Sequence, residues 1–151
     1  MSFSSRRPVV AATLTLAALF LWLRVPRGKT AAMVLLCAVG LSEATGSLVI
    51  KPWMHRARPC RAVASIRAPE GCDDGYSFPS DHAAISASAV VALACAVPFS
   101  VVASVPLSLV VGASRIYLGQ HYLSDVLAGY LLGALSALVL DRAVRFRRES
   151  R

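Results

Sequence analysis

Charged residues are scarce in this chain, and long stretches of it contain none. Only 16% of the 151 residues are charged, 56% are hydrophobic, and the mean hydropathy is +0.61. That composition is too apolar for an ordinary soluble domain, although the length suits a single domain, residues 1–151. The apolar residues form long, almost charge-free runs, which are typical of membrane helices. The sequence therefore predicts an integral membrane protein that crosses the bilayer several times.

Motifs of nucleic-acid-binding proteins are missing, although 16 Lys and Arg residues outnumber 8 Asp and Glu residues. No basic stretch is interleaved with aromatic residues in the way that nucleic-acid binding requires. The basic residues instead lie in the gaps between apolar runs and at the C-terminus, which favours anionic lipid headgroups and control of topology. We therefore expect these Lys and Arg residues to interact with the lipid bilayer and not with nucleic acid.

Metal and cofactor motifs are also lacking, since no Cys/His metal spacing and no Gly-rich phosphate loop occurs. We therefore expect no metal and no cofactor. Two of the four cysteines, Cys37 and Cys95, lie in apolar runs and are interpreted as packing residues. Cys60 and Cys72 lie in the long polar loop, where they form a disulfide in an oxidising compartment or stay free thiols.

The N-terminal region lacks a small-x-small cleavage site. Arg6 and Arg7 precede an apolar run over residues 9–23, as in a signal peptide, but Trp22 and Arg24 follow where a cleavage site would be. We interpret this run as an uncleaved first helix.

The apolar runs predict an all-α bundle of about five transmembrane helices. Glu43 lies within the second, where it must face protein or water, either supporting a site from beneath or bonding to a nearby Ser or Thr. Gly129 and Gly133 form G-x-x-x-G, which predicts close packing of the last helix on a neighbour. The basic tail, residues 141–151, is expected to be surface-bound or disordered. The expected helices cover residues 8–23, 30–50, 80 or 81 to 97, 99–113 and 122–140.

Three polar clusters fall on the same side of the membrane if the five helices alternate in direction. Lys51, Arg58 and Arg115 supply three cations suited to phosphoryl oxygens. Ser80, Asp81 and His82 open a helix, whose backbone N–H groups and dipole favour an anion. The clusters read Lys51-x6-Arg58-Pro59, Pro79-Ser80-Asp81-His82 and Ser114-Arg115-x5-His121-x3-Asp125.

His121 and Asp125 are four residues apart, so on a helix they share one face. The carboxylate can then accept the imidazole Nδ1–H and leave Nε2 as a nucleophile, while His82 protonates the leaving oxygen. Without a metal motif, these residues favour a metal-free covalent route through phosphohistidine. Taken alone, the pair is equally typical of residues capping a membrane helix.

Together the clusters resemble the signature of the type 2 phosphatidic acid phosphatase (PAP2) superfamily, K-x6-R-P, P-S-G-H and S-R-x5-H-x3-D, over residues 51–125. The resemblance implies a helical, metal-independent membrane phosphatase acting on lipid phosphates or diphosphates. This chain is one helix short of the six common in the family. Carried over by motif position, the resemblance implies that His121 is the nucleophile, Asp125 its partner and His82 the general acid, with Lys51, Arg58, Ser80 and Arg115 as phosphate ligands.

Asp81 departs from the family pattern, which usually has Gly at this position. A carboxylate pointing into a phosphate pocket would repel the substrate, whereas at a helix N-terminus it can cap the helix and point away. The P-S-D-H sequence also resembles the variant in bacterial undecaprenyl diphosphate phosphatases of the superfamily. We therefore group Asp81 with the phosphate-binding residues and expect a polyprenyl diphosphate substrate.

Several functions remain open alternatives. Undecaprenyl diphosphate is the first expectation, followed by phosphatidylglycerophosphate, phosphatidic acid or another prenyl-linked phosphate. A phosphotransferase would pass the group from His121 to a lipid acceptor, and a non-catalytic lipid-binding subunit would use the same cations. Vanadate-dependent haloperoxidases share related motifs but are soluble, so the apolar runs argue strongly against them.

The remaining basic residues of the loop have simpler interpretations. His55 and Arg56 are expected at the membrane interface, and Arg61 and Arg67 as solvated charges. By the positive-inside rule, the side opposite the clusters is cytoplasmic, so the site is expected to face the periplasm or exterior of a bacterial inner membrane. Arg6 and Arg7 argue mildly against this. The residues that determine the orientation are Arg24, Arg27, Lys29, Arg142, Arg145, Arg147, Arg148 and Arg151.

Overall fold

The fold, obtained as a computed structural model, describes residues 7–26 and 28–150. Arg6, Arg27 and Arg151, which enter the expectations above, lie outside the described residues, as does the side chain of Arg7. The described residues form helices and no strands, so the all-α prediction is confirmed. The elements are α1 (Arg7–Arg24), α2 (Gly28–Ala44), the π-helix η2 (Thr45–Ile50), α3 (Lys51–Met54), α4 (Pro59–Ala62), α5 (Asp81–Ala96), the 3₁₀-helix η3 (Pro98–Ser100), α6 (Val101–Tyr117) and α7 (Leu123–Glu149).

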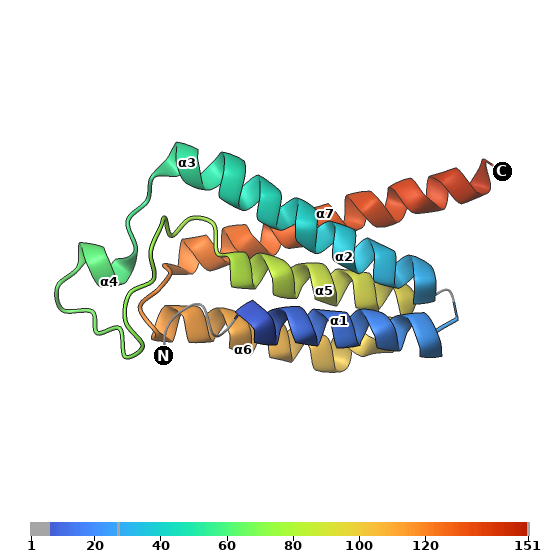
Figure 1. The fold of residues 1–151 in the computed structure, drawn as a ribbon, viewed down its shortest axis with the longest axis horizontal. Coiled ribbons are helices and arrows are strands. Elements are labelled where there is room, and N and C mark those ends of the chain that lie inside the picture. Colours follow the sequence, from blue (N-terminus) through green and yellow to red (C-terminus); the bar gives the residue numbers. More distant parts are fainter. Residues whose placement is uncertain (1–6, 27, 151) are drawn as a thin grey trace.

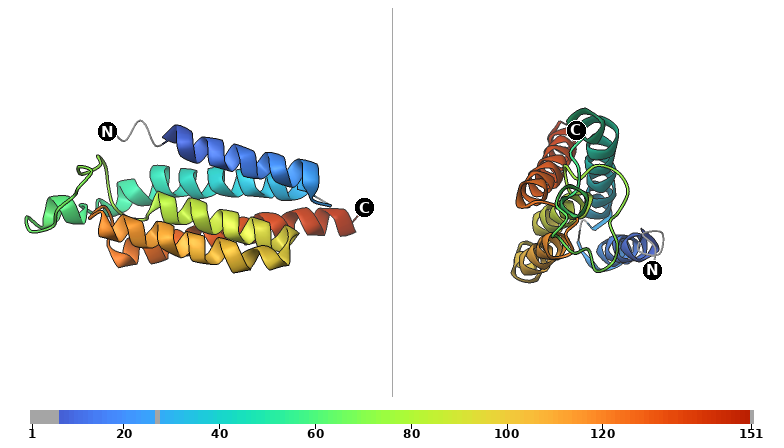
Figure 2. Two further views of the ribbon diagram at one scale, coloured as in Figure 1. Left: turned by 90° about the horizontal axis from the view of Figure 1, so that it is seen from below. Right: turned by 90° about the vertical axis from the view of Figure 1, so that its left-hand side faces the viewer.

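The five longer helices run alternately in opposite directions along one bundle (Figure 1). Helix α5 packs against α7, α2 and α6, while α1 packs against α2 at the side of the bundle (Figure 2). The end of α2, the start of α5 and the junction between α6 and α7 lie at the same end of the molecule (Figure 1). Their meeting confirms the prediction that the three polar clusters share one end.

Three segments are long and apolar enough to cross a membrane, namely Gly28–Ala62, Pro98–Tyr117 and Leu123–Glu149. Leu14–Arg24 and α5 are shorter apolar helices, so the number of five crossings stays a prediction. Large apolar side chains are exposed around the bundle, among them Leu131 at 62% and Phe99 at 80%. Such a surface suits lipid contact better than water.

Helices α5 and α7 approach each other closely because two glycines of α7 face α5. A Cβ atom at Gly133 would lie 2.0 Å from the Ala84 carbonyl oxygen, and one at Gly129 would lie 2.4 Å from that of Ser80. Ser88 Oγ donates to the Gly133 carbonyl oxygen at 3.1 Å across the same contact. The predicted close packing of the last helix is therefore confirmed, and α5 is its neighbour.

Helix α2 changes its geometry shortly before the site. Residues Thr45–Ile50 form a π-helix, and the Lys51 N–H donates to the Gly46 carbonyl five residues earlier. Such wider turns are frequent at functional sites. Glu43 lies just before this segment and is exposed, so it is not a buried support beneath the site.

Helix α7 continues to Glu149, well past the predicted end at Leu140. Arg145 Nε donates to Asp141 Oδ2 at 2.6 Å one turn apart, a spacing that stabilises helices. Arg148 donates to the Thr30 hydroxyl at the start of α2. The expectation of a disordered tail is therefore wrong up to Glu149, because these contacts extend the helix.

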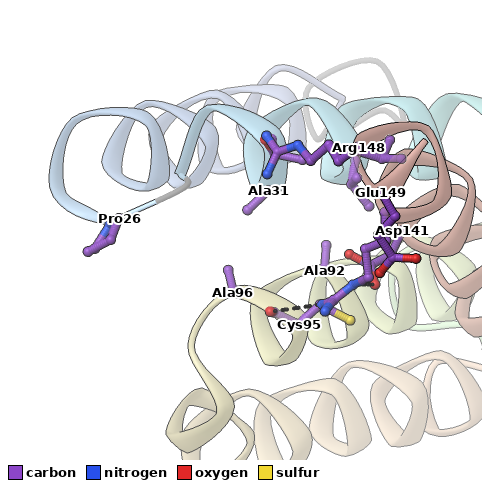
Figure 3. Close-up of a pocket in the computed structure, with 12 residues that line it drawn as sticks. Pro26, Ala31, Ala92, Cys95, Ala96, Asp141, Arg148 and Glu149 are labelled. Carbon is purple, nitrogen blue, oxygen red and sulfur yellow. Dashed lines mark hydrogen bonds and ion pairs between the residues drawn. The ribbon is translucent and has the colours of Figure 1, made fainter. Parts of the chain in front are cut away.

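A pocket of about 320 Å³ lies at the end of the bundle opposite the polar clusters (Figure 3). It is bordered by the start of α2, the end of α5 and the last turns of α7, with Ala31 and Ala92 among its apolar residues. None of the predicted site residues lines it. Its charged rim is balanced, with two carboxylates and two guanidinium groups from Asp141, Arg145, Arg148 and Glu149.

The α5–α7 contact predicts that Gly133→Ala destabilises the protein by about 2 kcal/mol, since the added methyl group must displace backbone. Gly40→Ala is the matched control, because a Cβ there meets nothing within 4 Å. Thermal unfolding in detergent measures both. Equal melting temperatures for the two variants would contradict the assigned contact.

Candidate functional site

The imidazole of His121 is almost completely buried, and its two ring nitrogens contact different partners. Nδ1 lies 2.7 Å from the Ser77 carbonyl oxygen, and Nε2 lies 3.2 Å from Arg58 Nη1. A carbonyl only accepts and a guanidinium only donates, so Nδ1 carries the proton and the lone pair of unprotonated Nε2 accepts from Arg58. The geometry therefore defines a neutral imidazole whose nucleophilic nitrogen faces a cation.

Asp125 is not the acceptor of the His121 Nδ1–H that the sequence predicts. Its Oδ2 lies 3.7 Å from Nδ1, and instead accepts the Tyr122 N–H at 2.9 Å. The reason is local. Helix α7 begins at Leu123, so His121 precedes the helix and does not share a helical face with Asp125. The carboxylate is close enough to stabilise a positive ring without holding its proton.

Arg58 is buried at the centre of the site and has unused donor capacity. It is 4% exposed, and its Nη1 also donates to the Gln120 carbonyl oxygen at 3.2 Å. Among the described residues, Arg58 Nε and the hydroxyl of fully buried Ser80 have no hydrogen-bond partner. Two unpartnered donors on predicted phosphate ligands fit an oxyanion, since buried polar groups are normally hydrogen-bonded.

The start of α5 brings the second cluster against α7. The Ser80 N–H donates to the Asp125 carbonyl oxygen at 3.0 Å, so this amide, expected to face an anion, is already used. His82 lies in the first turn of α5 and is close enough to Arg115, His121 and Arg58 for electrostatic interaction. The structure therefore brings both histidines and both arginines together.

Asp81 forms an ion pair with Lys51, linking the start of α5 to the first residue of α3. Their side chains are 30% and 13% exposed. The expectation that Asp81 caps the helix and points away is wrong, because the nearby lysine attracts the carboxylate. This pair also reduces the expected repulsion between Asp81 and a phosphate, since the charge of the carboxylate is balanced by Lys51.

The junction between α6 and α7 fixes the third cluster through the backbone. The Arg115 carbonyl oxygen accepts the Gln120 and His121 N–H groups at 3.1 and 3.3 Å. Arg115 Nε donates to Ser114 Oγ at 3.2 Å. The turn needs Gly119 at φ +67°, where a Cβ would lie 2.8 Å from Ile66.

A disulfide between Cys60 and Cys72 closes the polar loop, with its sulfur atoms 1.97 Å apart. Of the two alternatives for these cysteines, a disulfide or free thiols, the structure therefore has the disulfide. The Gln120 side chain holds the same loop, donating to the Gly71 carbonyl oxygen at 2.6 Å and accepting the Asp73 N–H at 3.1 Å. Sequence reasoning missed Gln120, whose only signal is its position beside His121.

Arg56 is the second residue that sequence reasoning missed. Its Nη1 lies 2.7 Å from Asp125 Oδ1, so it is a partner of the buried carboxylate and not only an interfacial residue. The signal was indirect, since a carboxylate inside a membrane bundle needs a cation.

Among the described residues, no three His, Cys, Asp or Glu side chains group as a metal site.

Comparison with known proteins identifies relatives for most of the chain. Residues 30–149 match the profile of the PAP2 superfamily. Phosphatidylglycerophosphatase B of Bacillus subtilis is 32% identical over an alignment of 117 positions that covers 67% of this chain and 54% of that protein. The undecaprenyl-diphosphatase of Sulfolobus acidocaldarius is 32% identical over 108 residues, 71% of this chain and 50% of that protein. This chain thus spans about half the length of such relatives.

A solved structure shares the fold. The crystal structure of a transmembrane PAP2-type phosphatidylglycerolphosphate phosphatase from Bacillus subtilis has a TM-score of 0.66 and 24% identity. The aligned region covers 95% of this chain and 71% of that one. Similarity at this identity shows the fold alone.

The disulfide predicts that replacing Cys60 and Cys72 together by Ser lowers stability by about 3 kcal/mol, because the open loop gains entropy when unfolded. Cys37→Ser, at an exposed free thiol, is the control. Thermal unfolding in detergent measures the loss, and thiol labelling with mass spectrometry counts the free cysteines. Four labelled cysteines in the non-reduced protein would contradict the pairing.

Proposed function

Because the chain belongs to the PAP2 superfamily, we propose that it is a metal-independent membrane phosphatase that hydrolyses a lipid diphosphate. The observation that carries the proposal is the buried His121, whose unprotonated Nε2 faces Arg58 at 3.2 Å. An unprotonated imidazole nitrogen beside a guanidinium suits attack on a phosphorus atom once the cation turns its donor to the phosphoryl oxygens.

In the proposed first step, Nε2 of His121 attacks phosphorus, an N–P bond forms and the bond to the leaving oxygen breaks. His82 donates a proton to that oxygen, while Arg58, Arg115 and the Ser80 hydroxyl bind the phosphoryl oxygens. The phosphorylated ring is cationic because Nδ1 keeps its proton, and Asp125, 3.7 Å away, stabilises that charge.

In the second step, water attacks phosphorus and His82 takes its proton. The N–P bond breaks, phosphate leaves and the neutral ring returns with its proton still donated to Ser77. Both steps balance without an additional reactant, so hydrolysis needs only the lipid phosphate and water. A lipid hydroxyl in place of water would make the protein a phosphotransferase.

The Lys51–Asp81 pair supports a diphosphate substrate. A diphosphate carries more negative charge than a monophosphate and competes better with one carboxylate for Lys51. The second phosphate can then use this lysine while Arg58 and Arg115 bind the first. Undecaprenyl diphosphate is our first candidate, which agrees with the name of the Sulfolobus relative.

A phosphatidylglycerophosphate phosphatase is the second candidate. It is supported by the 32% identity to phosphatidylglycerophosphatase B. We further propose that the site faces the periplasm or exterior, since basic residues such as Arg142 and Arg147 lie at the opposite end of the bundle.

The mechanism predicts that His121→Ala lowers phosphate release by more than about a thousandfold, because no other group replaces the nucleophile. His55→Ala, at an exposed histidine, should retain activity. The assay uses detergent-solubilised protein in EDTA with undecaprenyl diphosphate, phosphatidylglycerophosphate and phosphatidic acid. Residual turnover in His121→Ala would exclude the nucleophile assignment, and loss of wild-type activity with EDTA would exclude the metal-free route.

The substrate assignment predicts that Asp81→Gly lowers the ratio of diphosphate to monophosphate turnover by about tenfold, since unpaired Lys51 then binds either substrate. Asp74→Gly is the control, because its fully exposed side chain pairs only with Arg61 in the loop. Steady-state kinetics on undecaprenyl diphosphate and undecaprenyl phosphate give the ratio. An unchanged ratio would contradict a role of Asp81 in selecting the diphosphate over the monophosphate.

A further inference from the structure

Asp125 is a completely buried carboxylate, and the position of its charge partner decides its role. Its side chain is 0% exposed. Arg56 Nη1 lies 2.7 Å from Oδ1, whereas His121 Nδ1 lies 3.7 Å from Oδ2. A buried carboxylate needs a close cation to stay ionised. In this structure the close cation is Arg56 and not the imidazole.

The guanidinium of Arg56 is held tightly at the start of α7. It donates to Ser124 Oγ at 2.7 Å as well as to Asp125. Its Cζ atom lies over the Tyr122 ring, 4.1 Å from the centroid and within cation–π range. Three residues around the first turn of α7, Tyr122, Ser124 and Asp125, therefore hold the Arg56 side chain. An arginine that only contacts solvent at the membrane interface would not have such a set of partners.

The backbone of Arg56 leads to the other side of His121. The Arg56 carbonyl oxygen accepts the Ser77 N–H at 2.9 Å, and the Ala57 carbonyl accepts the Ser77 hydroxyl at 3.3 Å. Ser77 in turn accepts the His121 Nδ1–H. Arg56 thus binds the Asp125 carboxylate with its side chain and, with its main-chain carbonyl, holds Ser77, whose own carbonyl accepts the His121 Nδ1–H.

We propose that Arg56 is a positioning residue for His121, which by pairing with Asp125 keeps the imidazole neutral, with Nδ1–H donated to Ser77 and Nε2 unprotonated. The catalytic role of His121 in this proposal rests on the proposed function, whereas its tautomer is inferred from the hydrogen bonds of the two ring nitrogens alone. Without Arg56, a carboxylate that has lost its guanidinium partner and lies 3.7 Å from the ring would favour the imidazolium form. A protonated Nε2 has no lone pair with which to attack phosphorus.

Other charges around His121 come from each element packed near it and remain unchanged when Arg56 is replaced. Their cations oppose protonation of the ring, while their carboxylates favour it. Removal of Arg56 therefore tips an existing balance toward protonation. Arg58 and His82 interact with these charges in turn, which are Asp73 of the loop, Arg61 of α4, Asp81 of α5, Arg115 of α6 and Asp125 of α7.

The kinetic test compares Arg56→Gln, Arg56→Lys and the control Arg61→Gln on undecaprenyl diphosphate between pH 5 and 9. For Arg56→Gln we expect kcat/KM at neutral pH to fall by roughly tenfold to a hundredfold. The fall should reside in kcat, and the acid limb of the profile should move up by about one pH unit. Arg56→Lys should return the acid limb most of the way to its wild-type pH. Arg61→Gln, whose partner Asp74 is fully exposed, should have the wild-type profile.

A double variant separates positioning from simple structural damage. If Arg56 acts through Asp125, adding Arg56→Gln to Asp125→Asn should leave the acid limb where Asp125→Asn alone places it, because no carboxylate charge remains to be balanced. A further upward shift in the double variant would overturn the proposal. So would an Arg56→Gln variant that melts at a lower temperature but keeps the wild-type pH profile.

A measurement without turnover distinguishes failure of this inference from failure of the proposed function. In ¹⁵N-histidine-labelled protein in micelles, with His121→Ala used for assignment, the wild-type His121 signals should show protonated Nδ1 and unprotonated Nε2 at neutral pH. Arg56→Gln should raise the pH midpoint of this titration. The expected NMR shift without phosphatase activity on any substrate would refute the function and keep the role of Arg56. An unchanged midpoint would refute the role itself.

Discussion

The close contact between α5 and α7 is the constraint on which the site depends. Without side chains at Gly129 and Gly133, the two backbones approach until the Ser80 amide reaches the Asp125 carbonyl at 3.0 Å. This single bond places the His82 turn of α5 beside the turn that carries His121. A more distant packing would leave the same residues at the same end of the bundle but too far apart to act on one phosphate.

The charges at this end of the bundle are largely compensated by the protein itself. Lys51 pairs with Asp81 and Arg56 with Asp125, so one ion pair joins α3 to α5 and the other joins the polar loop to α7. Arg58 differs, because among the described residues it hydrogen-bonds only neutral acceptors: two carbonyls and the imidazole. Burial makes such a cation costly unless an anion completes it. Burial of Arg58 therefore lowers the stability of the protein alone and raises its affinity for phosphate.

The sequence allowed the helices and the three clusters to be predicted, because charge-free runs and alternation determine which loops share an end. It failed where the local chain path matters. His121 was assumed to share a helical face with Asp125, but it lies before the helix, so Ser77 becomes its acceptor. Arg56 and Gln120 were missed because their partners are distant in sequence and no spacing pattern marks them. The last turns of α7 were missed because contacts with α2, not hydrophobicity, extend them.

The π-helix that precedes Lys51 has a consequence for how this segment can evolve. A π-turn holds one more residue than an α-turn, so deleting a single residue within Thr45–Ile50 would restore an ordinary helix of similar hydrophobicity. Because the wider turn absorbs the extra residue, Lys51 would keep nearly the same direction about the axis after such a deletion, whereas winding the undeleted segment as an α-helix would rotate Lys51 by about 100°. The segment should accordingly tolerate exchanges among apolar residues, and homologues with a one-residue gap here should still place the lysine beside the start of α5 on an ordinary α-helix.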